Sequence, residues 1–240
     1  MSLPLARVRV EPGPGYDSGA WYWQVPAVAQ LARTGLELDA GITVLVGENG
    51  SGKSTLIEAL AAAWSARLTA AVKHWAPRPG DADADLHRHL RLTGERPPPQ
   101  GGCFLRAEAM HAHFTAMDTG TDLRAFDGRG LNARSHGEGF LAFLESRQTE
   151  RGLYLLDEPE AALSFRSCLA LLFQLADAVT AGSQVLLATH SPLLAAAPGA
   201  RILELGADGI TPRRWAELDM VQDWRDFLTA PDRWLRHLTG

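Results

Sequence analysis

The stretch Ile42–Ala63, ITVLVGENGSGKSTLIEALAAA, decides the fold of this chain. It begins with a β-branched run typical of a buried strand, continues through a glycine-rich turn and ends in apolar residues at helical spacing. Gly47, Gly52, Lys53 and Ser54 fill the pattern G-x-x-x-x-G-K-S/T of a phosphate-binding loop. In such a loop backbone N–H groups turn toward the phosphates, the lysine reaches the β- and γ-phosphates, and the hydroxyl binds Mg²⁺. The stretch therefore predicts a nucleotide-binding α/β protein.

Length and composition suit one α/β domain. The chain has 240 residues, of which 46% are hydrophobic and 21% charged. No apolar run approaches the ~18–20 residues that span a bilayer, and Met1–Val10 lacks a signal-peptide core, so we expect a cytoplasmic protein without membrane insertion. The net charge of −5 gives no general attraction to nucleic acid, although a local basic patch is compatible with it. Cys103 and Cys168 lie in apolar stretches without CxxC spacing, which favours core positions.

The residues before the phosphate loop include an aromatic cluster. Val8–Val10 is predicted as a strand, and Trp21, Tyr22 and Trp23 follow it. An aromatic ring upstream of a phosphate loop can stack on adenine, but packing in the core is the simpler interpretation.

The helix after the phosphate loop is predicted to run to about Val72, and the segment His74–Gly102 then changes character. It reads as two surface loops around a short strand at Leu90–Thr93. Alternating acids and histidines in this segment would be compatible with a metal site, but solvated residues are the better interpretation, and we assign no ligands. These side chains are Asp81, Asp83, Asp85, His87 and His89.

The segment Cys103–Glu108 is predicted as a strand that ends in charged residues. Because the C-terminal ends of strands carry the chemistry in nucleotide-binding α/β folds, Arg106 and Glu108 are candidates for contact with the site. A structural salt bridge explains them at least as well. A short helix at Met110–Met117 and a loop at Asp118–Ala133 are expected to follow.

A serine and two glycines open the next predicted helix. The segment Ser135–Gly139, SHGEG, precedes apolar residues at helical spacing. Such a helix N-terminus can bind an anion. Ser135 with Glu138 three residues later is also an ordinary capping box, and the segment alone does not separate the two interpretations.

Two further buried strands are predicted to end in polar residues. Leu153–Leu156 is followed by Asp157 and Glu158, and Gln184–Thr189 is followed by His190. One carboxylate at a strand end can support Mg²⁺, and a second beside it can deprotonate an attacking water. A histidine there can donate a hydrogen bond to a γ-phosphate. We interpret these side chains as functional because they follow a phosphate loop.

In this order the motifs resemble those of the ABC-type ATPase family. They are GENGSGKST as Walker A, SHGEG as the signature, LYLLDEPEAALS as Walker B with the D-loop, and LLATHSP with the switch histidine. The resemblance covers about Ile42 to Ile202. Within the family, Pro159-Glu160 and Ser191-Pro192 look like the soluble branch related to SMC, RecF and OLD proteins, and the chain is similar to small stand-alone bacterial AAA family ATPases.

The resemblance implies a role for each matching residue. Glu158 would be the general base, Lys53 would contact the β- and γ-phosphates, and His190 would sense the γ-phosphate. Ser54 and Asp157 would hold Mg²⁺. ATP would contact Gly47, Glu48, Asn49, Gly50, Ser51, Gly52, Lys53, Ser54 and Thr55 of one subunit and Ser135 and Gly137 of another. One cassette per chain therefore implies a head-to-tail homodimer around two ATP molecules, with Ala161–Ser164 facing the partner's site.

Three positions depart from the family pattern. His136 follows Ser135 where transporter cassettes have glycine, and Gly139 stands where the small ATPases have serine. No glutamine ends the Cys103–Glu108 strand at the expected Q-loop position, for which Glu108 is a candidate replacement. This departure puts fast turnover in doubt.

The C-terminal part is predicted to begin with a strand at Ile202–Leu205 and a hairpin partner around Ile210–Arg214. Two helices, Met220–Leu228 and Arg233–Leu238, are expected to follow. Their aromatic and apolar side chains favour packing over a ligand site. These are Trp215, Trp224, Phe227, Trp234 and Leu235.

We therefore predict a single P-loop NTPase domain over residues 1–240 with an ABC-type core, a mostly parallel sheet flanked by helices. A helical signature part would cover about 109–150 and a helical extension about 216–240. The expected function is a soluble ATPase dimer that switches conformation on a macromolecular partner, nucleic acid or protein. The alternatives are the nucleotide-binding subunit of a transporter with a separate permease, and a slow ATP-dependent clamp or sensor.

Overall fold

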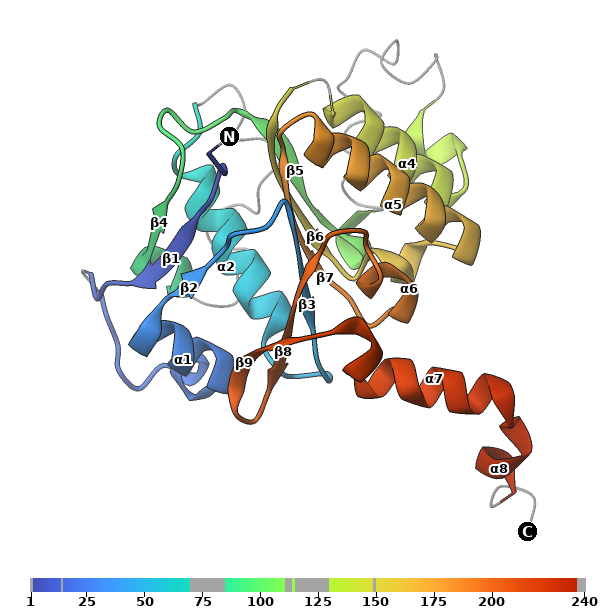
Figure 1. Ribbon diagram of the computed structural model, residues 1–240. Helices are drawn as coiled ribbons and strands as arrows, with labels where there is room; N and C mark the ends of the chain where they lie inside the picture. Colours follow the sequence, from blue (N-terminus) through green and yellow to red (C-terminus); the bar gives the residue numbers. More distant parts are fainter. Residues whose placement is uncertain are drawn as a thin grey trace.

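The main sheet of the computed structural model has the strand order β5-β6-β7-β3-β8-β9 (Figure 1). Residues 2–13, 15–69, 85–110, 114, 130–148 and 150–236 are described. The six strands are β3 (Ile42–Val46), β5 (Gly101–Arg106), β6 (Gly152–Asp157), β7 (Gln184–Ala188), β8 (Arg201–Gly206) and β9 (Gly209–Arg213). The first five strands in this order pair in parallel, and β9 returns antiparallel to β8. Every residue of β3, β6 and β7 is buried, as their apolar runs predict.

A second, three-stranded sheet lies beside the first. It has the antiparallel order β2-β1-β4, with β1 at Arg7–Val10, β2 at Leu36–Glu37 and β4 at Leu90–Thr93. The buried amide of Gln184 in β7 joins the two sheets: its Oε1 accepts from the Leu5 N–H and its Nε2 donates to the Leu5 carbonyl, both at 2.8 Å. The strands expected at Val8–Val10 and Leu90–Thr93 are thus confirmed.

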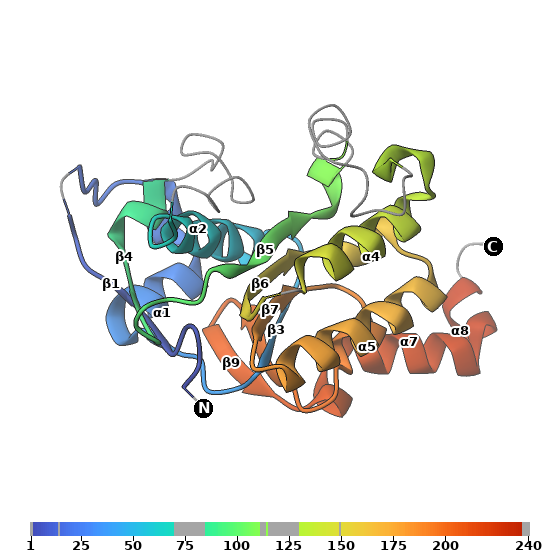
Figure 2. The same cartoon turned by 90° about the horizontal axis from the view of Figure 1, so that it is seen from above.

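Helices cover both faces of the main sheet. α1 and α2 lie on one side and α4 and α5 on the other, as both views show (Figures 1 and 2). Among the described residues the α-helices are α1 (Pro26–Thr34), α2 (Lys53–Ser65), α4 (His136–Arg147), α5 (Phe165–Thr180), α6 (Pro192–Ala195), α7 (Asp219–Thr229) and α8 (Pro231–Leu235). The 3₁₀ helices are η1 (Trp21–Gln24), η3 (Asp85–His89), η4 (Ala107–Ala109), η6 (Leu131–Ala133), η7 (Pro159–Ala162) and η8 (Trp215–Glu217). Cys103 and Cys168 are buried, as predicted.

Helix α2 ends at Ser65, earlier than the predicted end at about Val72. The next backbone groups form tight turns: Arg67 N–H donates to the Trp64 carbonyl at 2.8 Å and Leu68 N–H to the Ser65 carbonyl at 3.2 Å. Arg67 also packs over the Trp64 ring, 5.0 Å from its centroid. The turn is therefore held by backbone bonds and a cation–π contact.

The histidine-rich segment contains no metal cluster in its described part. His89 is buried, and its Nδ1 accepts from the Gly13 N–H at 3.3 Å. Among the described residues there is no group of three or more side chains that could hold a metal ion. Asp81 and Asp83 lie outside these residues, as do most of the expected helix Met110–Met117 and loop Asp118–Ala133.

The C-terminal helices do not form the packed apolar face that the sequence predicts. α7 and α8 extend away from the sheet (Figure 1), and Val221 is the buried residue of α7. Trp224 is 53% exposed and Trp234 is 48% exposed. The prediction was wrong because these helices project past the body of the domain, where the described part of this chain does not cover them.

None of the described helices is long and apolar enough to cross a membrane.

Candidate nucleotide-binding site

The phosphate loop lies between β3 and α2, as predicted. Gly47, Gly50 and Gly52 have positive φ angles of 144°, 80° and 97°. A Cβ on Gly47 would lie 2.2 Å from the Leu205 carbonyl oxygen, and one on Gly52 would lie 2.5 Å from Val25 Cγ1. Both the backbone angle and the close neighbours therefore require glycine at these two positions.

Lys53 lies inside the curl of this loop. Its Nζ donates to the carbonyls of Gly47 and Glu48, each at 3.0 Å, and the residue is 3% exposed. Burial lowers the pKa of Lys53, while the nearby carboxylates of Glu158, Asp157 and Glu160 act in the opposite direction. The ammonium group is thus held at the first turn of α2, the position from which a phosphate-loop lysine reaches an anion.

Ser54 and Asp157 come together across the sheet edge. Ser54 Oγ donates to Asp157 Oδ1 at 3.1 Å, and Asp157 is 1% exposed at the end of β6. Burial is the main cause that raises the pKa of Asp157 to about 6; Glu158 and Glu58 add to it, while Ser54 and Arg106 oppose it. A hydroxyl and a carboxylate are the hard oxygen ligands that Mg²⁺ prefers, so this donor set fits the ion.

Glu158 and His190 meet at the ends of β6 and β7. Glu158 Oε1 lies 2.9 Å from His190 Nε2. Glu158 has a φ of 48°, the one positive value of a non-glycine residue in the described ranges, and its N–H donates to the Ala188 carbonyl at 2.9 Å. Such a conformation is strained for a residue with a side chain and is frequent at functional sites.

The predicted signature segment forms a capping box at the start of α4. Ser135 Oγ accepts from the Glu138 N–H at 3.3 Å, and Glu138 Oε2 accepts from the Ser135 N–H at 3.0 Å. Gly137 lies beside η7, because a Cβ there would be 3.6 Å from the Ala162 carbonyl oxygen. Helix α4, which Ser135 caps, lies on the side of the sheet opposite to α2 (Figure 1).

Comparisons with known proteins agree with this geometry. Residues 29–72 match the family model "AAA domain", and residues 124–196 match "AAA domain, putative AbiEii toxin, Type IV TA system". The "Hemin import ATP-binding protein HmuV" of Streptomyces coelicolor is 32% identical over 186 residues, which cover 70% of this chain and 66% of that protein. This chain is an ABC-type P-loop ATPase.

Further similarities concern the fold and the length of this ATPase. A "Putative ABC transporter ATP-binding protein" of Streptomyces avermitilis is 31% identical over an alignment of 235 residues that covers 87% of this chain and 40% of that protein. A solved ATP binding subunit of an ABC transporter superposes with a TM-score of 0.50 at 18% identity and covers 92% of this chain and 94% of its own. This structure supports the fold alone. The ATPase spans about two thirds of the first relative and two fifths of the second.

Glu160 supports the turn that carries His190, and the sequence did not predict this contact. Its Oε1 accepts from the Thr189 hydroxyl at 2.7 Å and from the His190 N–H at 2.5 Å. Ser191 N–H in turn donates to Thr189 Oγ1 at 2.9 Å. Glu160 in η7 therefore holds the turn that carries His190. No local sequence pattern predicts this contact.

Arg106 reaches the site from the end of β5, as one of the two sequence interpretations expects. Its Nε lies 3.6 Å from Asp157 Oδ2 and its Nη2 lies 3.4 Å from Glu108, while its Nη1 pairs with Glu58. The Glu108 side chain is 78% exposed and is linked to Asp157 through Arg106. Glu58 was missed, although it lies one helical turn after Ser54 and hence on the same face of α2.

Proposed function

We propose that this ATPase binds Mg²⁺–ATP at the phosphate loop and hydrolyses it with Glu158 as general base. The observation that carries the proposal is the meeting of the ends of three neighbouring strands. β3 leads into Lys53, β6 ends beside Glu158, and β7 leads to His190. Ligands of open α/β sheets bind at the carboxyl ends of such strands.

Each residue would have a defined task. Lys53 would bind the β- and γ-phosphates, for which its buried ammonium is positioned by the loop. Ser54 and Asp157 would hold Mg²⁺, which neutralises phosphate charge when bound. The Glu158 carboxylate would accept a proton from the attacking water, and His190, 2.9 Å away, would orient that carboxylate and bind the γ-phosphate.

A homodimer would complete the site. Gly137 lies beside η7, and the neighbouring residues Ser135, Ala161 and Ser164 are exposed. A second copy would bring this surface to the phosphate loop of the first. The exposed Phe165, directly after the D-loop, would then be covered by the partner.

The role with the stronger support is that of an ATP-binding subunit for a separate membrane protein. Both reported relatives are named as import or transporter ATP-binding proteins. It therefore ranks above the soluble ATPase switch that we predicted first from the sequence. The matches to two AAA-domain models favour a soluble ATPase switch as the second candidate.

Turnover and oligomeric state test the proposal on wild type and Glu158→Gln, with Glu145→Gln as a control at an exposed acid on α4. Because the base is lost, we expect Glu158→Gln to hydrolyse ATP at no more than about 1/100 of the wild-type rate. We also expect it to accumulate as an ATP-bound dimer, detected by light scattering. Glu145→Gln should behave as wild type. Unchanged turnover in Glu158→Gln would contradict the assignment, and dimerisation of the wild type without turnover would support the clamp.

Cell fractionation separates the two roles. A transporter subunit should be recovered with membranes and crosslink to a membrane protein. A soluble switch should stay in the supernatant under the same conditions.

A further inference from the structure

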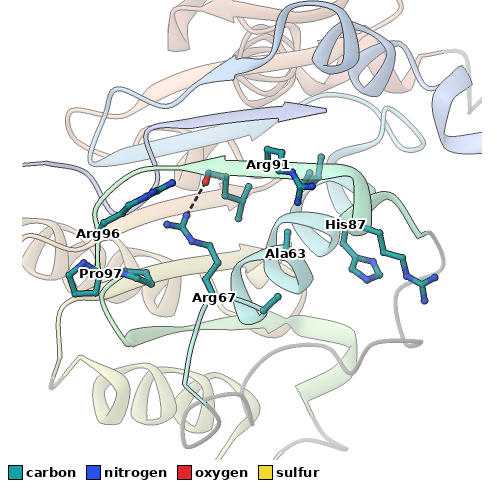
Figure 3. A pocket seen from close by; sticks show the side chains of 11 residues that line it. Ala63, Arg67, His87, Arg91, Arg96 and Pro97 are labelled. Atoms are coloured by element: carbon teal, nitrogen blue, oxygen red, sulfur yellow. Dashed lines mark hydrogen bonds between the residues drawn. The ribbon is translucent and has the colours of Figure 1, made fainter. Parts of the chain in front are cut away.

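A second hollow lies at the C-terminal end of α2, next to the small antiparallel sheet (Figure 3). Its volume is about 760 Å³. Small-molecule sites have volumes of roughly 300–1,000 Å³. The residues that line it come from the end of α2, from η3, from β4 and from the turn after β4. None of them belongs to the nucleotide-binding site described above.

The lining is strongly basic although the whole chain carries a net charge of −5. Arg67, His87, Arg88, Arg91 and Arg96 face this hollow, which we call the arginine pocket, and none of the described residues that line it is acidic. Figure 3 shows Arg67, Arg91 and Arg96 arranged around the same space. Its electrostatic character is therefore opposite to that of the chain.

Two of these arginines are only weakly neutralised. Arg88 Nε lies 3.3 Å from Asp85, and Arg91 Nε lies 2.9 Å from Glu11. In both pairs the two side chains are about 60% exposed, so each pair contributes little.

Arg67 and Arg96 have no carboxylate partner among the described residues. Arg67 Nη1 donates to the Leu92 carbonyl at 3.3 Å. Burial, and then the charge of Arg96, lower the pKa of Arg67. The two guanidinium groups therefore repel each other across the pocket, and a bound anion would relieve this repulsion.

The rest of the lining is apolar. It consists of alanine and leucine side chains with Pro97 and Pro98 at one side. A guanidinium group binds a phosphate through two parallel hydrogen bonds, and apolar walls bind the body of a ligand. We propose that the arginine pocket binds the phosphate of a small phosphorylated organic molecule whose apolar or planar part packs on the leucines and prolines.

Calorimetric titration with adenosine 5′-monophosphate tests this proposal. The titration uses Lys53→Ala protein, so that the phosphate loop contributes little. Arg88→Gln/Arg96→Gln removes two exposed lining charges, and Arg33→Gln/Arg225→Gln removes two exposed charges elsewhere. Because charge-assisted contacts are lost, we expect Arg88→Gln/Arg96→Gln to bind the nucleotide with no more than about one tenth of the parent's affinity. The control Arg33→Gln/Arg225→Gln should bind it like its parent. Equal thermal unfolding midpoints would show that both fold.

Three results would overturn the proposal. The first is equal affinity in the two double variants. The second is equal binding of adenosine, which lacks the phosphate. The third is binding of a 12-nucleotide single strand that depends on Arg88 and Arg96 while the mononucleotide does not bind, which would assign the pocket to a nucleic-acid backbone.

Discussion

Among single residues, Asp157 shows the strongest conflict between burial and negative charge, and this conflict indicates its function most clearly. It is a carboxyl group 1% exposed at the end of an apolar strand, with two further acids close by. Ser54 and Arg106 stabilise its charged form only in part. A cation at this point would remove the conflict, which is why the group suits a Mg²⁺ site better than a structural one.

This conflict predicts a pH-dependent stability. Between its ordinary pKa of 3.8 and its value of about 6, the folded protein keeps the proton of Asp157 while the unfolded chain loses it. The free energy of unfolding should therefore fall as pH rises through this window, by up to about 3 kcal/mol. Asp157→Asn should remove this fall, so its free energy of unfolding should exceed that of wild type above pH ~6. The lost ion pair with Arg106 reduces this gain.

Urea unfolding with EDTA at pH ~4, 5, 6 and 7 measures this effect. Asp223→Asn, an exposed acid on α7, is the control and should follow wild type. A lower stability of Asp157→Asn at neutral pH would contradict the prediction.

On the scale of elements, the phosphate loop is held by its neighbours as well as by its own sequence. The end of β8 places the Leu205 carbonyl against Gly47, and Val25 before α1 packs against Gly52. The loop therefore has little freedom to change its path. Its backbone N–H groups are arranged before any phosphate arrives, which reduces the entropic cost of binding.

Two alanine substitutions separate these contacts from backbone strain. Gly47→Ala would meet the Leu205 carbonyl at 2.2 Å, whereas Gly50→Ala, with φ of 80°, would meet nothing within 4 Å. Gly50→Ala should cost roughly 1 kcal/mol of unfolding free energy for its left-handed backbone, and Gly47→Ala at least about twice that. Chemical denaturation of both variants compares the two costs, and similar values would show that β8 does not constrain the loop.

For the whole molecule, the body of the domain and its C-terminal end differ in packing. The main sheet is buried between helices, while α7 and α8 extend from it with most of their large apolar side chains exposed (Figures 1 and 2). Leu218 and Val221 attach this end to the core. The stability of the domain should therefore depend little on what lies beyond α7.

A truncation tests this independence. Removal of residues 231–240 deletes α8, in which Trp234 is 48% and Leu235 is 41% exposed. Because little buried surface is lost, we expect the free energy of unfolding to change by less than about 1 kcal/mol. Thermal and urea unfolding beside the full chain give the answer. A larger loss would mean that α8 packs on the domain more tightly than its exposure indicates.

The sequence by itself determined the parts of this protein that depend on local patterns. The phosphate loop, the apolar strands before Asp157 and His190, and the Ser135 cap each follow from residue spacing within a few residues. Parallel strands of one sheet place their carboxyl ends at one edge, so the meeting of Ser54 with Asp157 could be predicted as well.

Only the tertiary structure decided which side chains from distant segments touch. The contact of Arg106 with Glu58 and Asp157, and that of Glu160 with His190, join different elements, and no spacing within one element encodes them. The exposure of Trp224 and Trp234 also depends on how far α7 and α8 extend beyond the sheet. Helical periodicity shows that a face is apolar; whether that face is covered depends on the neighbours that the fold brings to it.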